Sequence, residues 1–214
     1  MEPTLVGKNT NCIKYKFRFA LGREFEQYDS YGSKIFTYRE DRKCCGNPKY
    51  TVYDIDEKII GSVENQMNCG KKTYIFYDED NQMINYIESN NDCCSCCSFT
   101  YNFYGADKNI ENILIKKNGC CSTVYELYDK YNTLTNRAEF LCKSCCKNYY
   151  YEYDVNNSDK VFKIDLNPFK IFENENEVDL TDKTLFNNGF SKIQIFLILD
   201  SVLFPSGDDG SANN

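Results

Sequence analysis

Cysteine is the residue type in this sequence with the most chemistry to offer, because thiolates bind metals and thiols accept acyl groups. The chain carries 13 cysteines, and most of them stand in short clusters. These clusters are Cys44-Cys45, Cys93-Cys94-Ser95-Cys96-Cys97, Cys120-Cys121 and Cys142-Lys143-Ser144-Cys145-Cys146, and Cys69 stands alone. They fall mostly between strand-like segments, so we expect several of them to gather at one end of the fold.

Three interpretations of the clusters compete. Residues 93–97 and 142–145 contain Cys-x-x-Cys pairs, and four thiolates hold zinc tetrahedrally. The two regions are too far apart in the sequence for a zinc ribbon, which disfavours zinc. Adjacent reduced cysteines that face a membrane are acceptors for palmitate, and two acyl chains anchor a protein far better than one. Cysteine also packs as a small buried hydrophobic residue.

Histidine is absent, and this excludes whole classes of enzymes. Ser-His-Asp and Cys-His catalysis need an imidazole as general base, and many zinc sites need one as a ligand. No paired-carboxylate signature stands in its place, so we expect no hydrolase or transferase activity. The net charge of −7 argues against nucleic acid as a partner, because DNA and RNA are bound by neutralising their phosphates.

The first residues, Met1-Glu2-Pro3-Thr4, lack the basic and apolar regions of a signal peptide. No glycine follows Met1 for myristoylation, and no prenylation motif ends the sequence. We therefore expect an intracellular protein with largely reduced cysteines. Its acidic charge also makes purely electrostatic attachment to an anionic leaflet weak, so a membrane-bound form would need another anchor.

A repeat of about 25 residues organises the chain. In each unit a Tyr-Asp or Tyr-Gly pair ends a strand-like run, a polar turn follows, and a second short run comes next. The repeated tyrosines are Tyr28, Tyr53, Tyr77, Tyr104, Tyr128 and Tyr153. Asp and Asn suit such turns, because their side chains bond the nearby backbone and tolerate left-handed dihedral angles. Each unit predicts a β-hairpin, and six hairpins predict about twelve antiparallel strands.

Residues 191–204 are apolar on nearly every side and predict a buried helix. At 1.5 Å per residue the helix would be about 21 Å long, shorter than the bilayer core of about 30 Å. It also carries two charged residues, Lys192 and Asp200. We therefore expect a core element, and a membrane-inserting tail is the alternative.

The hairpins and the helix together predict one mainly β domain. Many antiparallel strands usually curl or close to remove their unpaired edges, and a closed barrel of this size needs an interior filler. We therefore expect a closed antiparallel barrel around the central helix, and a two-sheet sandwich is the alternative. The expected organisation is a lead-in over 1–12, the barrel over 13–204 and a disordered tail over 205–214.

Several segments in this order are similar to those of one known family. They are Asn47-Pro48-Lys49-Tyr50-Thr51-Val52, the hairpin over 72–84, the cysteine cluster over 93–97, the cysteine motif and aromatic strand over 141–153, and Phe196-Leu197-Ile198-Leu199-Asp200-Ser201-Val202-Leu203-Phe204. The sequence therefore resembles the phospholipid scramblases, relatives of the tubby-like barrel. The resemblance runs from about Asn47 to Phe204, roughly three-quarters of the chain.

The resemblance implies two kinds of site. The implied lipidation sites are Cys93, Cys94, Cys96 and Cys97, which stand where scramblases carry a palmitoylated cluster. In the family, a calcium-binding acidic segment precedes the terminal helix. That place holds Glu177, Asp179 and Asp182, and hard oxygen ligands suit calcium. An acidic loop that faces solvent is the alternative.

The resemblance also implies a function. We expect a lipoprotein at the cytoplasmic face of a membrane, the plasma membrane in particular. It would be associated with calcium-stimulated, bidirectional movement of phospholipids between the leaflets. The expected partners are membrane phospholipids, and the expected cofactor is calcium. The alternative is a tubby-like lipid-binding or scaffolding module without transport activity, to which the pair Lys116-Lys117 would contribute charge.

Overall fold

The fold is known for most of the chain but not for all of it. The computed structural model describes residues 12–18, 22–29, 31–41, 46–68, 71–90, 98–119, 122–142, 148–157, 160–166, 169–174, 176–186 and 189–205. The predictions for the lead-in before residue 12, for the tail after residue 205 and for most of the cysteines fall outside these ranges.

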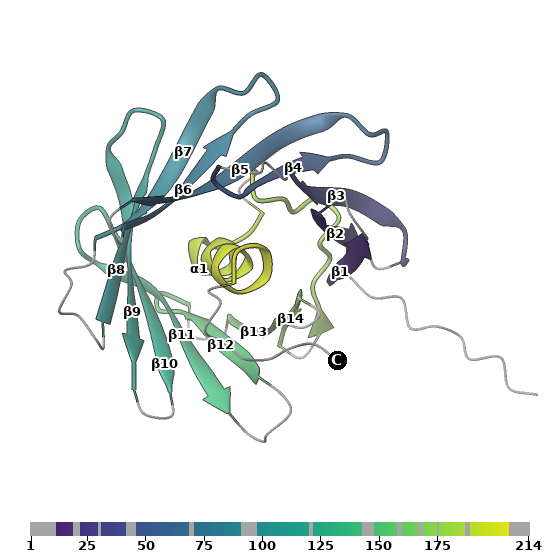
Figure 1. Cartoon of the computed structure of the whole chain (residues 1–214). Coiled ribbons are helices and arrows are strands. Elements are labelled where there is room, and N and C mark those ends of the chain that lie inside the picture. The colour runs from purple at the N-terminus through teal and green to yellow at the C-terminus, as the bar shows by residue number, and fades with distance from the viewer. Residues whose placement is uncertain are drawn as a thin grey trace, which may run out of the picture.

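The described residues form one antiparallel sheet followed by one helical segment (Figure 1). The strands pair in sequence order, each with the next. They are β1 (Cys12–Arg18), β2 (Gly22–Tyr28), β3 (Lys34–Glu40), β4 (Lys49–Tyr53), β5 (Ile59–Asn68), β6 (Lys71–Tyr77), β7 (Met83–Ser89), β8 (Ser98–Tyr104), β9 (Ile110–Asn118), β10 (Thr123–Asp129), β11 (Leu134–Cys142), β12 (Asn148–Asp154), β13 (Val161–Leu166), β14 (Phe169–Glu173) and β15 (Asn176–Glu177). The α-helix α1 (Lys192–Leu197) continues directly as a π-helix, η1 (Ile198–Leu203).

The prediction of a mainly β fold built from antiparallel hairpins is confirmed. The six hairpins that the tyrosine repeat predicts are β2–β3, β4–β5, β6–β7, β8–β9, β10–β11 and β12–β13. The sheet contains three further strands, β1, β14 and β15, so the predicted count of about twelve was too low. The count missed them because none of the three ends on a Tyr-Asp or Tyr-Gly pair.

The closure predicted for this sheet is not established. The sheet curves around the helix, and β1 pairs with β14 through a single residue pair, Ile13 with Phe169 (Figure 1). Strand β14 has only five residues, and its first residue lies opposite the second residue of β1. The ladder between the first and last long strands is therefore short among the described residues, whereas β1 pairs with β2 along all seven of its residues.

The tyrosine repeat marks a β-bulge next to each of five hairpin turns. In the β4–β5 hairpin the register shifts between Val52 and Tyr53. The carboxylate of Asp54 then accepts hydrogen bonds from the backbone N–H groups of Asp56 and Lys58, both at 2.9 Å. The fourth turn residue adopts a left-handed conformation, with φ of 61° at Glu57. The same position is left-handed at Gly32, Asn81, Lys108 and Asn132. The repeat is therefore one turn geometry used again and again.

The helix lies inside the curve of the sheet and forms the centre of the core (Figure 1). Its residues Phe196 to Leu199 are fully buried. The ring of Phe196 lies 4.4 Å from that of Tyr101 and 6.0 Å from that of Tyr125, measured between ring centroids. Along β6 the alternate residues Tyr74 and Phe76 are buried, as period-two alternation requires of a strand with one face on the core. The predicted core helix is thus present and buried.

Candidate functional site

The most unusual polar group in the interior is Asp200, in the middle of η1. Its carboxylate accepts a hydrogen bond from the ammonium of Lys72 at 2.8 Å and from the hydroxyl of Tyr74 at 3.1 Å. The ammonium of Lys116 lies 3.4 Å from its second oxygen. The three charged side chains are only 10 to 22% exposed. Two strands that are not neighbours, β6 and β9, therefore hold the helix through one carboxylate.

The alternation of side chains along β6 and β9 and the π-helical turn of η1 together bring these side chains to one place. Tyr74 and Leu114 are buried on the inner face, so Lys72 and Lys116, two residues away along their strands, also point inward. A π-helical turn is rare and is often found at functional sites. Here it presents Asp200 to both lysines, while Leu199 and the other apolar residues of the turn stay in the core.

Burial and the neighbouring charges act on the pKa of Asp200 in opposite directions, and the charges dominate. Burial alone would raise the pKa of Asp200, and the charges of Lys72 and Lys116 more than offset this, so the pKa lies below its usual value. The reverse holds for the tyrosines that face the carboxylate. Burial and the negative charge of Asp200 raise the pKa of Tyr74 and of Tyr101, so both phenols stay neutral. The negative charge of Asp200 is therefore fully compensated, and the group of two lysines and one aspartate carries one excess positive charge.

A second buried carboxylate lies near the other end of the helix. Glu152 is fully buried and accepts hydrogen bonds from the side-chain amides of Gln194 at 2.8 Å and of Asn136 at 3.2 Å. Gln194 also completes a capping box with Ser191 at the start of α1. Burial raises the pKa of Glu152, and the hydrogen bonds from Ser191, Gln194 and Asn136 only partly oppose it. This carboxylate positions the first turn of the helix.

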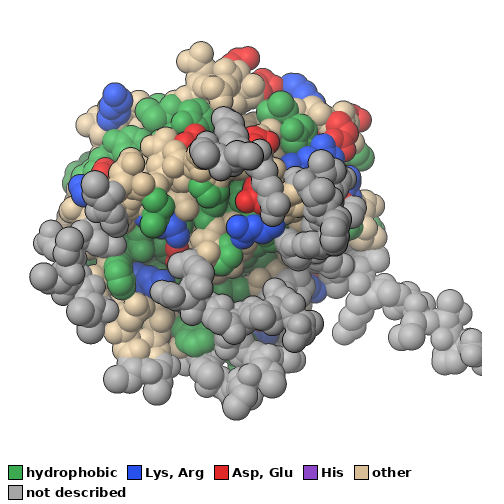
Figure 2. All heavy atoms as spheres, viewed as in Figure 1, with side chains coloured by type: hydrophobic (Ala, Val, Ile, Leu, Met, Phe, Trp, Pro, Cys, Tyr) green, Lys and Arg blue, Asp and Glu red, His purple; other side chains and the backbone are tan. Residues whose placement is uncertain are grey.

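Four lysines lie at the sheet edge where β6 begins and β9 ends. Lys71 and Lys117 are about half exposed there, and Lys72 and Lys116 turn inward toward Asp200. Lys71 is 3.8 Å from a carboxylate oxygen of Glu88, and Lys117 is 2.7 Å from one of Glu126. Figure 2 likewise shows basic and acidic side chains close together near the middle of the visible face. The edge is thus rich in lysine but largely charge-paired.

The predicted lipidation cluster stands in the sequence between two strands, β7 and β8, that reach this same edge. β7 ends and β8 begins here, because alternate connections of an antiparallel meander lie at the same edge. Residues 91–97 stand between these two strands, but Cys93, Cys94, Cys96 and Cys97 lie outside the described residues. Their acylation stays a prediction.

Two of the predicted calcium ligands, Glu177 and Asp179, have local partners of their own. Glu177 lies in β15, 3.5 Å from the ammonium of Lys170. Asp179 accepts hydrogen bonds from the backbone N–H of Thr181 at 3.0 Å and from its hydroxyl at 2.5 Å, which lowers its pKa, and Asp182 is exposed. In the part of the chain that the structure describes, no three acidic, cysteine or histidine side chains are grouped to hold a metal ion. The local bonds of Asp179 are those of a turn, and calcium binding here stays a prediction.

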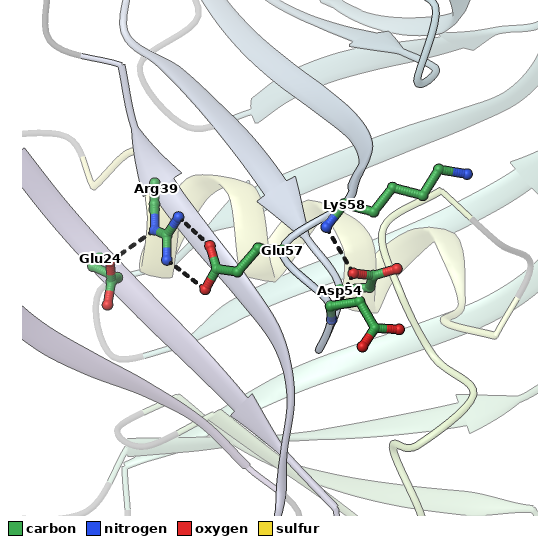
Figure 3. Close-up of polar contacts among 6 residues, drawn as sticks. Glu24, Arg39, Asp54, Glu57 and Lys58 are labelled. Atoms are coloured by element: carbon green, nitrogen blue, oxygen red, sulfur yellow. Dashed lines mark hydrogen bonds and ion pairs between the residues drawn. The ribbon is translucent and has the colours of Figure 1, made fainter.

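Charged residues on the outer face form a ladder between neighbouring strands and turns (Figure 3). The guanidinium of Arg39 donates to Glu57 through both terminal nitrogens, at 2.5 and 2.9 Å, and its Nε donates to Glu24 at 3.2 Å. Lys58 pairs with Glu79 of the next turn at 2.7 Å. These contacts link β2, β3 and two turns on the outside of the sheet, and we assign them a structural role.

Comparison with known proteins adds no family to this geometry. No protein-family model matches the chain, and no curated protein matches it. The resemblance to scramblases therefore stays a prediction. Among the described residues, no helix has both the length and the apolar character needed to cross a bilayer.

Proposed function

We propose that this chain is a tubby-like, scramblase-related barrel that works at the cytoplasmic face of a membrane as a lipid-binding or scaffolding module. One observation carries the choice of a module over a transporter. The helix fills the inside of the sheet, with Phe196, Leu197, Ile198 and Leu199 fully buried, and Asp200 ties it to β6 and β9. A phospholipid could pass through the space that the sheet encloses only by displacing this helix.

Closure of the sheet into a barrel is part of the proposal. What supports it is the pairing of Ile13 with Phe169 and the curvature of the sheet around the helix (Figure 1). Barrel closure removes the unpaired edges that a sheet of this many strands would otherwise present. The described strands form one sheet and not the two of a sandwich, so the alternative is a curved open sheet, which leaves such edges.

Membrane attachment in this proposal comes from acyl chains on the cysteines between β7 and β8. The lysines at that edge help, because Lys71 and Lys117 are exposed enough to reach lipid phosphates. Their carboxylate partners and the net charge of −7 keep this contribution small. Two or more acyl chains would supply the stable anchoring that charge does not.

The test is membrane fractionation of cells that express the full chain, combined with labelling by a palmitate analogue. We expect the wild type to be labelled and to sediment with membranes. A variant with Ser in place of Cys93, Cys94, Cys96 and Cys97 loses the label and moves to the soluble fraction. The matched control replaces Cys120 and Cys121 with Ser and stays on membranes. Retention of the first variant on membranes would refute this mode of attachment.

Transport remains the second candidate function, on the strength of the resemblance alone. Acylated protein purified from these cells is reconstituted into phospholipid vesicles, and lipid flip is followed with and without calcium. For a module we expect the rate of empty vesicles in both conditions. A calcium-stimulated rate above that level would refute the module and favour lipid movement, with Glu177, Asp179 and Asp182 as the ligands to replace first.

A further inference from the structure

The outer face of the sheet carries a groove that the membrane proposal does not use. It lies over β12, β13 and β14 and has a volume of about 550 Å³. Its lining residues are Tyr149, Tyr151, Val161, Lys163, Phe172 and Asn174. This volume falls within the range of about 300–1,000 Å³ that is typical of small-molecule sites.

The groove faces outward because the alternate residues of the same strands face the core. Tyr150, Ile164 and Ile171 are buried around the helix, so their neighbours along the strands point away from it. The aromatic rings of the groove are thus not part of the core. The ring planes of Tyr149 and Tyr151 are nearly perpendicular at 88°, with their centroids 5.5 Å apart.

Among the described residues that line the groove, Lys163 is the one that carries a charge. Its ammonium lies 4.9 Å from the ring centroid of Tyr149 and 5.1 Å from that of Phe172, between two aromatic faces. Its carboxylate neighbour, Asp165, is 3.6 Å away, longer than a strong charged hydrogen bond. The cation is therefore held in place beside apolar rings, and its charge is only weakly paired.

We propose that this groove binds a small ligand that has a flat aromatic body and one negative charge. The rings of Tyr149 and Tyr151 are nearly perpendicular, so a flat body that stacks on the face of Tyr151 meets Tyr149 at its edge. Lys163 provides the single complementary charge, and the exposed side chain of Asn174 is a hydrogen-bonding group at the groove. The site lies on the wall of the sheet, so it does not depend on the proposed membrane function.

The test uses two fluorescent probes whose polar groups differ. Anilinonaphthalene sulfonate is a flat aromatic anion, and phenylnaphthylamine is its neutral counterpart without the sulfonate. We expect the folded wild type to bind the anion at one site. Lys163→Met weakens the anion about tenfold and leaves the neutral probe unchanged, because an interaction with a charged group is lost. Lys163→Arg retains the anion, and Tyr151→Ala weakens both probes.

The matched control is a second lysine that lies over a tyrosine but outside the groove. Lys49 lies 5.1 Å from the ring centroid of Tyr77, so Lys49→Met and Tyr77→Ala remove similar groups and leave both probes unaffected. Melting temperatures show that each variant is folded. The proposal is overturned if the wild type does not bind the anion, if Lys163→Met binds it as well as the wild type, or if the control variants lose it equally.

Discussion

Replacing Asp200 with Asn removes the carboxylate that two lysines share. Removing one partner of a fully buried ion pair costs about 3–5 kcal/mol, because the other charge stays buried without compensation. Lys72 and Lys116 are 16% and 22% exposed, so water offsets part of this cost. We therefore expect Asp200→Asn to lower the free energy of unfolding by about 2–3 kcal/mol. For a domain of this size that corresponds to a fall in melting temperature of about 5–10 °C.

The effect has a defined dependence on pH. The pKa of Asp200 is lower in the fold than its ordinary value of 3.8, so the folded state holds the proton less tightly than the unfolded state. The stabilisation is therefore complete above that value and is lost as the pH falls through the lower, folded pKa. The gap between wild type and variant should be constant at neutral pH and should close in acid.

Thermal melts of matched variants measure the loss of stability caused by Asp200→Asn. Glu79→Gln breaks a pair with Lys58 of almost the same length, 2.7 Å, but both its members are more than half exposed, and we expect no measurable change. Adding Lys72→Met to Asp200→Asn should recover about half of the loss, because an uncompensated ammonium is then gone. Equal shifts for Asp200→Asn and Glu79→Gln would refute the argument from burial.

Three further predictions concern single residues and are checked by thermal melts. Burial raises the pKa of Glu152 in the folded state, so its contribution to the stability of the wild type falls as the pH rises above about 4.5. Glu152→Gln should remove this dependence of stability on pH. An unchanged dependence would show that Glu152 is not its source. Lys108→Gly should stabilise the chain by about 1 kcal/mol, because a side chain is strained at the φ of 61° found there. The control is Lys130→Gly in the turn between β10 and β11, which should not stabilise the chain. Gly61→Ala should destabilise it, because the new Cβ would lie 2.7 Å from the backbone oxygen of Tyr77, and a neutral result would show that the backbone yields at little cost.

The hairpins were predictable because each carries its own local signal. A Tyr-Asp or Tyr-Gly pair marks the bulge and the start of the turn, and both are set by residues within a few positions of each other. The helix over 191–204 was predictable for the same reason, since Ser191 caps it and its sequence is continuously apolar. Strands β1 and β14 lack such a signal, and the pairing of Ile13 with Phe169 joins residues from opposite ends of the chain.

The buried polar groups were less accessible to sequence reasoning. Asp200 stood out as an acid in an apolar helix, but its partners come from β6 and β9, far away in the sequence. A signal for Lys72 existed, because it lies two residues before the inward-facing Tyr74. Glu152 and the groove around Lys163 depend on which strands become neighbours, and alternation along one strand does not reveal that.

The most direct test of the account is amide hydrogen exchange on the chain purified from cells, free in solution and bound to phospholipid vesicles. If the helix is a core element, the amides of residues 193–199 are among the slowest to exchange in both states. If the lysine-bearing edge faces the membrane, the ends of β6 and β9 around Lys71 and Lys117 gain protection on vesicles. Rapid exchange of the helix in solution, or protection gained on vesicles by the helix alone, would contradict the account.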